Sequence, residues 1–249
     1  MMCICPNCGR SEIVIGDPNP DCRFCHVPML KPTMEYTGLM MSPNFVLDRF
    51  QKVVGKHGWK KILTGKFKQE RESCIAAIWA YGVQRITKVP EYWVEVVTDD
   101  ETPDCKVIWL DASSGRNHRK IMNLEIVEWD EHRDNMLELI EQKCAKAYPQ
   151  YFFLTVFVRN GKETLVEDIL KKIKSLKVPF AEIWILGRLP VLIGAYRLFL
   201  AHPEPTKLVD FDVFDSYREN AGQTAFLQPN RRGSSTERTD MGLLYLPIP

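Results

Sequence analysis

The sequence of 249 residues has no long apolar run, no excess of one charge and no internal repeat. No apolar stretch approaches the roughly 18 residues that a membrane helix needs, so no membrane segment is expected. The opening residues, MMCICPNCGR, lack a basic segment followed by an apolar stretch, so we expect no secretion signal and a cytoplasmic location. With 33 Lys and Arg against 32 Asp and Glu, the composition excludes a uniformly basic nucleic-acid coat protein.

Two motifs of large enzyme classes are also absent. The chain has no G-x-x-x-x-G-K-[ST] phosphate loop, which argues against a nucleotide-driven motor. It has no G-x-S-x-G, so an α/β-hydrolase has no support. The hydrophobic content of 45% is sufficient for a real core, and the length suits one domain with a small attachment.

Cysteine is concentrated at the N-terminus, where five of the eight cysteines lie within the first 25 residues. Four of them form two knuckles, Cys5-Pro-Asn-Cys8 and Cys22-Arg-Phe-Cys25, separated by thirteen residues. Two residues between paired cysteines let both thiolates reach one ion, and two such knuckles complete a tetrahedral zinc site. Residues 3–30 resemble a zinc ribbon. A site of four thiolates has no open position, so this zinc is expected to be structural.

The other readings of the cysteines stay open at this point. Two disulfides are the alternative, although the chain shows no secretion signal. Cys3 is an alternative ligand to Cys5, and the later cysteines are expected to be small core residues. We therefore predict a zinc ribbon over residues 1–32 and a linker over residues 33–43.

Hydrophobic periodicity predicts helices and strands from residue 44 onward. The pattern is helical from Asn44 to about Ile86 and again near residues 136–147 and 164–174. Strands are expected at Trp93–Thr98, Lys106–Asp111, Ile121–Trp129, Tyr151–Val158, Ala181–Leu186 and Tyr196–Ala201. The second and third strands should form a hairpin, and the fourth and fifth a parallel pair.

This order of elements predicts an α/β domain over residues 44–205, with a mixed sheet flanked by helices. Residues 206–249 are predicted to be a C-terminal extension that is partly flexible, because the pattern weakens beyond His202 and residues 229–240 are polar.

The order of elements, with Pro103-Asp104 at the head of the second strand, resembles the restriction-endonuclease-like PD-(D/E)xK family over roughly residues 68–200. The resemblance implies a DNA endonuclease in which Glu72, Asp104 and Glu125 hold Mg²⁺ or Mn²⁺. Such a site places paired carboxylates on a hard cation and positive charge near the scissile phosphate.

The chain departs from this family at the lysine that should follow Glu125 by two residues, because Val127 stands there. Lys120 in the hairpin, or Lys143 on the next helix, is the candidate replacement. A binding module for nucleic acid or protein, with no catalysis, is the alternative that Val127 favours.

Charge is distributed unevenly along the chain. Between Arg49 and Arg71 there are eight basic residues and one acidic residue, with Trp59 and Phe67 interleaved. Such a segment can neutralise phosphates, or can be a solvated helix face. The candidate DNA-binding residues are Lys52, Lys56, Lys60, Lys61, Lys66, Arg116 and Arg119. Whether the chain has a protein partner or forms a homo-oligomer stays open.

Overall fold

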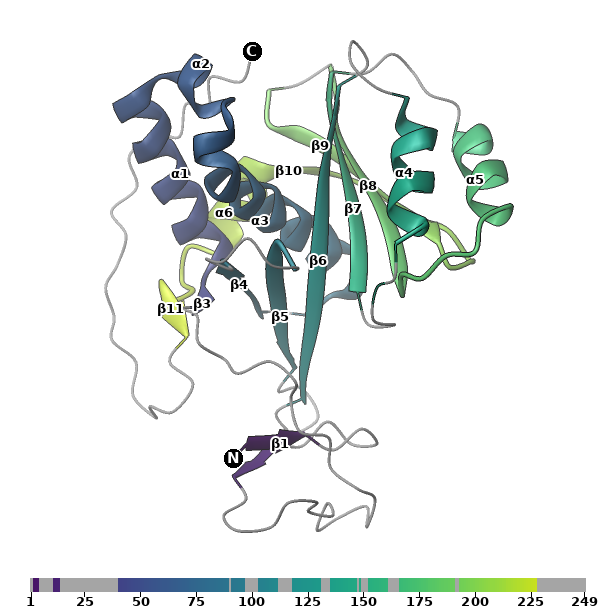
Figure 1. Cartoon of the computed structure of the whole chain (residues 1–249). Coiled ribbons are helices and arrows are strands. Elements are labelled where there is room, and N and C mark those ends of the chain that lie inside the picture. The colour runs from purple at the N-terminus through teal and green to yellow at the C-terminus, as the bar shows by residue number, and fades with distance from the viewer. Residues whose placement is uncertain are drawn as a thin grey trace.

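The computed structural model describes the chain as a nine-stranded mixed sheet with helices on both faces (Figure 1). The described residues are 2–4, 11–13, 40–89, 91–96, 103–111, 118–130, 135–146, 148, 152–160, 166–190 and 193–227. The α/β architecture with a mixed sheet flanked by helices is therefore confirmed. The four cysteines predicted to bind zinc lie outside the described residues; on either side of the first knuckle, β1 (Met2–Ile4) and β2 (Ser11–Ile13) form a separate antiparallel pair.

The main sheet has the order β10-β9-β8-β7-β6-β5-β4-β3-β11. Its strands are β3 (Met40–Met41), β4 (Glu91–Val96), β5 (Cys105–Asp111), β6 (His118–Asp130), β7 (Phe152–Asn160), β8 (Glu182–Arg188), β9 (Ala195–His202), β10 (Lys207–Asp212) and β11 (Phe226–Leu227). Among the described strands of this sheet, only the β6–β7 and β7–β8 pairs are parallel. The predicted hairpin is the β5–β6 pair, and the predicted parallel pair is β7–β8.

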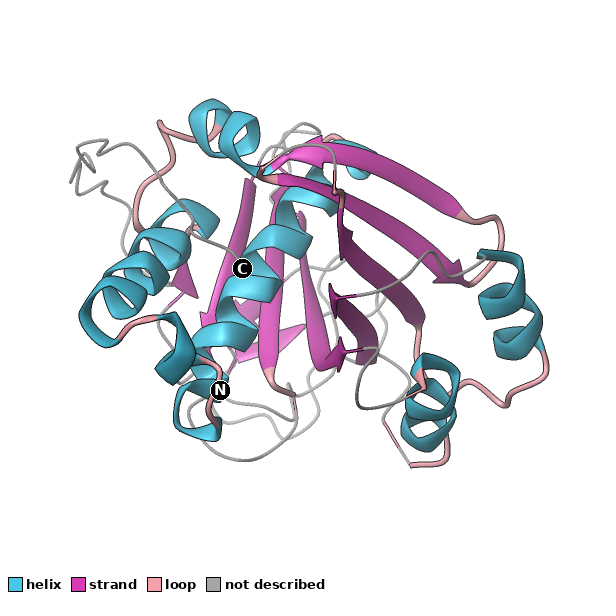
Figure 2. Ribbon diagram, turned by 90° about the horizontal axis from the view of Figure 1, so that it is seen from above, coloured by secondary structure: helices cyan, strands magenta, loops and turns pink. Residues whose placement is uncertain are grey.

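The helices form two layers, one on each face of the sheet (Figure 2). They are α1 (Pro43–His57), α2 (Trp59–Ile62), the 3₁₀ turn η1 (Gly65–Phe67), α3 (Lys68–Thr87), α4 (Met136–Cys144), α5 (Val166–Lys174) and α6 (Val213–Glu219). Side chains of α1, α3 and α6 share the larger core on one face, and those of α4 and α5 share a second core on the other.

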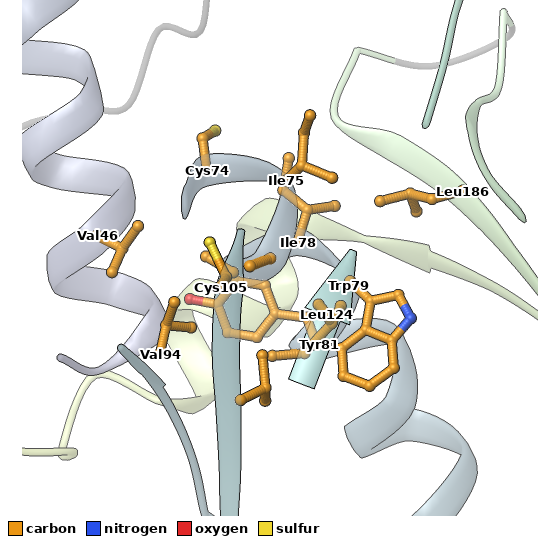
Figure 3. Packing of buried hydrophobic residues seen from close by; sticks show 14 of the residues in the cluster. Val46, Cys74, Ile75, Ile78, Trp79, Tyr81, Val94, Cys105, Leu124 and Leu186 are labelled. Atoms are coloured by element: carbon orange, nitrogen blue, oxygen red, sulfur yellow. The ribbon is translucent and has the colours of Figure 1, made fainter. Parts of the chain in front are cut away.

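Helix α3 is the centre of the larger core. Its residues Ala76, Ala77, Trp79 and Ala80 are all fully buried, because α1 covers the side of α3 that the sheet does not. Figure 3 shows this packing of α3 side chains against β5, β6 and β8. The helical pattern predicted from Asn44 to Ile86 is divided into α1, α2, η1 and α3, and the first break falls at Gly58, which has a φ of +77°.

In the main sheet and its core, four described elements lie where no helix or strand was predicted: β3, β10, α6 and β11. Strand β3 falls inside the predicted linker 33–43 and pairs with β4 and β11. Strand β10 follows the predicted domain end at residue 205 and pairs with β9, and α6 packs on the same face as α3. The described part of the predicted extension therefore continues the same sheet and core.

Gly194→Ala is expected to destabilise the protein by about 2–3 kcal/mol. Gly194 precedes β9 with a φ of +87°, and a Cβ there would lie 2.3 Å from the Phe214 ring. The control is Gly55→Ala on α1, where a Cβ meets nothing within 4 Å and helix propensity favours alanine by about 0.5–1 kcal/mol. Urea unfolding of both variants measures the difference, and equal midpoints would contradict the prediction.

Candidate functional site

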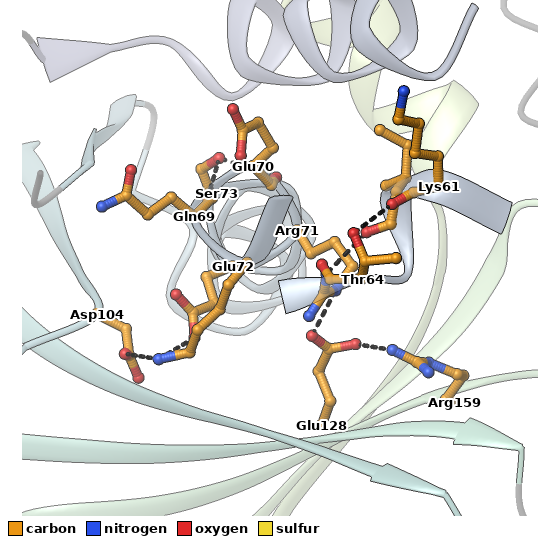
Figure 4. Close-up of polar contacts among 12 residues, drawn as sticks. Lys61, Thr64, Gln69, Glu70, Arg71, Glu72, Ser73, Asp104, Glu128 and Arg159 are labelled. Atoms are coloured by element: carbon orange, nitrogen blue, oxygen red, sulfur yellow. Dashed lines mark hydrogen bonds and ion pairs between the residues drawn. The ribbon is translucent and has the colours of Figure 1, made fainter. Parts of the chain in front are cut away.

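The carboxylates of Glu72 and Asp104 meet at the start of α3. Lys68 Nζ lies 3.1 Å from Glu72 Oε1 and 3.3 Å from Asp104 Oδ1 (Figure 4). Lys68 and Glu72 are one helical turn apart on α3, whereas Asp104 immediately precedes β5. Lys68 and Asp104 are 36 positions apart in the sequence, and the fold brings the carboxylates of Glu72 and Asp104 to the single ammonium of Lys68.

Asp104 lies where β5 separates from β6. The pairing of β5 with β6 ends at Cys105 and Leu124, while β6 continues to Asp130. Asp104 Oδ2 accepts a hydrogen bond of 2.7 Å from the backbone N–H of Ile126. Beyond Leu124, β6 has no β5 residue beside it, and the Asp104 carboxylate takes that place. It accepts the hydrogen bond of a backbone N–H that would otherwise be unpaired at the edge of β6. This contact holds Asp104 against the strand that carries Glu125.

Glu125 faces the opposite side of the sheet from Glu72. Its neighbours Leu124 and Ile126 belong to the α3 core, so alternation directs Glu125 toward α4. Glu125 Oε1 accepts hydrogen bonds from Lys143 Nζ and, at 3.1 Å, from Tyr148 Oη. Glu125 Oε2 is buried and has no hydrogen-bond partner within the described part of the chain.

The structure thus brings Glu72 and Asp104 together. Glu125 lies on the other face of β6, next in sequence to Ile126, whose amide donates to Asp104. In the described ranges, no three acidic, histidine or cysteine side chains converge as one metal-binding group.

Lys143 is the lysine that reaches Glu125. Val127 is half-buried and packs in the core under α4 and α5. Lys120 of β6 pairs with Trp109 of β5. It lies five residues, roughly 16 Å, along β6 from Glu125. Sequence reasoning missed Tyr148, because a tyrosine in the loop after α4 carries no spacing signal that links it to β6.

The acidic residues at this site shift the pKa values of their neighbours. Burial, together with repulsion from Asp104 and Glu128, raises the pKa of Glu72 to about 7, although Lys68 acts in the opposite direction. Burial also raises the pKa of Tyr148, with further contributions from Glu125 and Asp104. Both pKa shifts include a contribution from Asp104, so its negative charge acts on both sides of β6.

Glu72→Gln is expected to raise the free energy of unfolding at pH 8 by up to about 3 kcal/mol and to change it little near pH 4. In the folded state the pKa of Glu72 is about 7 instead of 4.5, so the folded state binds more protons between these values. Stability therefore falls as pH rises through this window, and glutamine removes that loss. Urea titrations across pH 4–8 measure it, with the exposed Glu141→Gln as control; parallel profiles for Glu72→Gln and the unmodified protein would contradict it.

The basic segment between Arg49 and Arg71, called the basic strip below, presents its candidate DNA-binding lysines to solvent. Its five candidate lysines, on α1, α2 and η1, lie on the surface, and none forms an ion pair with another described residue. These residues are Lys52, Lys56, Lys60, Lys61 and Lys66. Arg116 lies outside the described residues, and Arg119 lies opposite Leu110 in the β5–β6 hairpin.

Comparison with protein-family models, with curated proteins and with solved structures finds no match to this chain. Across the residues that the structure describes, no helix combines the length and apolar character needed to cross a bilayer. A functional assignment therefore depends on the geometry of the site.

Proposed function

We propose that this chain is a Mg²⁺- or Mn²⁺-dependent DNA endonuclease of the restriction-endonuclease-like type. The observation that carries the proposal is that the carboxylates of Glu72 and Asp104 both contact the Lys68 ammonium, at the point where β5 separates from β6. The order α3, β4, β5, β6, α4, β7, with three antiparallel strands and then a parallel one, supports it.

The residues present fit a hard divalent cation. Magnesium is commonly bound by one or two carboxylates, with waters and substrate phosphates completing its coordination. The Lys68 side chain is 59% exposed, so its ammonium can leave the two carboxylates when a metal ion replaces it. Glu125 faces the other side of β6, so in this proposal it acts by holding Lys143 and is not a third ligand of the same ion.

In this proposal Glu72 and Asp104 hold the metal, which when bound polarises the phosphate and activates water. The pKa of Glu72 is raised first by burial and then by repulsion from Asp104 and Glu128, and a divalent cation would relieve this repulsion. Lys143, held by Glu125, supplies the positive charge that Val127 cannot provide. The basic strip neutralises phosphates on either side of the cleaved bond.

The test is cleavage of supercoiled plasmid and of linear oligonucleotides with Mg²⁺ or Mn²⁺, with EDTA as the metal-free control. We expect cleavage by the unmodified protein, loss in Glu125→Ala and retention in Glu141→Ala, which removes an exposed carboxylate from α4. Failure of the unmodified protein to cleave any of a varied set of substrates would contradict the proposal.

A binding module without catalysis is the second candidate. It is favoured by the ammonium partners that the carboxylates already have: Lys68 for Glu72 and Asp104, and Lys143 for Glu125. For this candidate we expect salt-dependent DNA binding, weakened by Lys60→Gln and Lys61→Gln, with no cleavage under any metal.

For the N-terminal region we propose structural zinc bound by Cys5, Cys8, Cys22 and Cys25. Metal analysis of freshly purified protein is expected to find about one zinc per chain, and Cys22→Ser should lower this content because four thiolates complete the tetrahedron. Freshly purified protein that contains no zinc would contradict the zinc ribbon.

A further inference from the structure

Lys68 is the cation in the first cluster of charges on the α3 face, and its position there is not fixed by packing. Its ammonium contacts one oxygen of Glu72 and one of Asp104, at 3.1 and 3.3 Å. The Lys68 side chain is 59% exposed, whereas both carboxylates are largely buried and Asp104 is held by the Ile126 amide. Lysine carries its charge on a flexible four-carbon stem, so this ammonium can leave the pair of carboxylates while α3 stays in place.

The second cluster of charges on this face is fixed. Glu128 of β6 forms ion pairs with Arg71 of α3 and Arg159 of β7, and these three residues are called the triad below (Figure 4). Arg71 Nη1 also donates to the backbone carbonyls of Ile62 and Thr64, at 2.7 and 2.8 Å. The Arg71 side chain is only 13% exposed, so its guanidinium stays with these partners and does not turn toward the pair of carboxylates.

The lysines that the sequence offered in place of Val127 also lie elsewhere. Lys143 contacts Glu125 on the α4 face of the sheet. Lys120 lies roughly 16 Å along β6 from Glu125. Among the described residues, Lys68 therefore combines a place beside the pair of carboxylates with freedom to move.

The balance of charge indicates what a released Lys68 ammonium would contact. Fully ionised, the two carboxylates carry a charge of −2, which falls to −1 with Lys68 and to zero with a divalent cation. With the pair neutralised, the Lys68 ammonium has lost the anions that held it. Substrate phosphates commonly complete the coordination of such a cation, and each phosphodiester carries one negative charge. A DNA phosphate is therefore the anion that would lie nearest to the released ammonium.

We propose that Lys68 has two positions: its ammonium bridges Glu72 and Asp104 in the metal-free protein, and it binds a DNA phosphate when the pair holds a divalent cation. The proposal rests on the proposed function for the metal and for DNA as the ligand. The first position makes Lys68 a competitor of the metal. The second position makes one phosphate contact depend on the metal, and it adds a positive charge on the α3 face to that of Lys143.

The first position is tested by Mn²⁺ binding at pH 8 without DNA, followed by electron paramagnetic resonance of the free ion. Lys68→Met keeps an unbranched side chain and removes the charge. We expect it to bind Mn²⁺ at least about 10-fold more tightly than the unmodified protein, because no ammonium opposes the cation. Lys171→Met, at an exposed lysine on α5, is the control and should stay within about twofold. Unchanged or weaker binding of Mn²⁺ by Lys68→Met would overturn the proposal.

The second position is tested by the salt dependence of DNA binding, since the logarithm of the binding constant falls with the logarithm of salt by about 0.9 for each phosphate contact. A duplex oligonucleotide is titrated without divalent cations and with Ca²⁺, which takes the same oxygen ligands, and the DNA is checked to be intact. With Ca²⁺ we expect the slope for Lys68→Met to be smaller than that for the unmodified protein by about 0.9. Without divalent cations the two slopes should agree, because the carboxylates then hold Lys68. Equal slopes with Ca²⁺ would overturn the phosphate contact.

Cleavage separates this inference from the proposed nuclease. Single-turnover cleavage at saturating Mn²⁺ should be at least about 30-fold slower in Lys68→Met, although this variant binds the metal more tightly, and a misfolded variant would lose both. Cleavage by Lys68→Met within about threefold of the unmodified protein would contradict the role of Lys68 and leave the nuclease standing. If the unmodified protein does not cleave but the Mn²⁺ affinity and the salt slope change as expected, the nuclease is contradicted and the two positions of Lys68 are supported.

Discussion

Asp104→Asn is expected to lower metal-dependent DNA cleavage at least 100-fold while leaving the fold intact. Asparagine has the same shape, and its carbonyl oxygen can still accept the hydrogen bond from the Ile126 amide at the edge of β6. It loses the negative charge that draws a cation to the pair of carboxylates. Losing one metal ligand costs several kcal/mol of transition-state stabilisation, and each 1.4 kcal/mol is a factor of about ten in rate.

The matched control is Asp210→Asn on β10, which removes an exposed aspartate paired with Arg197. Cleavage rates under single-turnover conditions and Mg²⁺ titrations are compared for the two variants, with urea unfolding as a check on the fold. Cleavage by Asp104→Asn within threefold of the unmodified protein would show that Asp104 only closes the sheet edge. An equal loss in Asp210→Asn would attribute the effect to general charge.

Much of the fold could be predicted from local periodicity, because strands and helices that bury one face leave a repeating pattern. The continuous apolar run before residue 159 predicted β7. Two strand patterns joined by a polar loop predicted β5 and β6 as a hairpin. Strand β3 has only two residues, too few to show alternation. Strand β10 has Leu208 exposed, so its hydrophobic pattern does not match a buried face. These elements depend on contacts with distant strands, which a local pattern does not contain.

The site was predictable only in part, for a related reason. Glu72 and Asp104 were expected to share a site, and the structure brings both to Lys68. Alternation correctly placed Glu125 and Val127 on one face of β6, but it does not say which helix covers that face. The side-chain contact between Asp104 and the Ile126 amide involves a backbone donor, which every residue except proline has, so it leaves no mark in the sequence.

The triad of Arg71, Glu128 and Arg159 spans 57 residues on one side of Glu128 and 31 on the other. Each member looks like an ordinary surface charge in sequence. The two ion pairs form because the fold brings α3, β6 and β7 together, and a local sequence pattern does not contain that contact. Lys68, Arg71 and Glu72 all lie on α3, and repulsion from Glu128 contributes to the raised pKa of Glu72, so the triad and the pair of carboxylates influence each other by charge.

Trp79→Ala is expected to destabilise the protein by about 3–5 kcal/mol, a large part of the roughly 5–15 kcal/mol that stabilises a typical domain. Trp79 is fully buried between α3 and the sheet, and its ring meets Trp184 of β8 edge-on at 5.9 Å. Removing the indole opens a cavity in the larger core and loses this aromatic contact. Urea unfolding measures the loss, and Ile193→Ala, at a side chain 69% exposed, should stay within about 0.5 kcal/mol.

Trp79→Phe separates ring packing from hydrogen bonding at this position. Trp79 Nε1 is buried without a hydrogen-bond partner among the described residues, so phenylalanine loses no hydrogen bond and should cost less than half as much as alanine. Because α3 carries Lys68, Arg71 and Glu72, looser packing of α3 in Trp79→Ala should weaken both charge clusters together. A phenylalanine variant as unstable as the alanine variant would contradict this account, since it would mean that the indole nitrogen matters more than the buried ring.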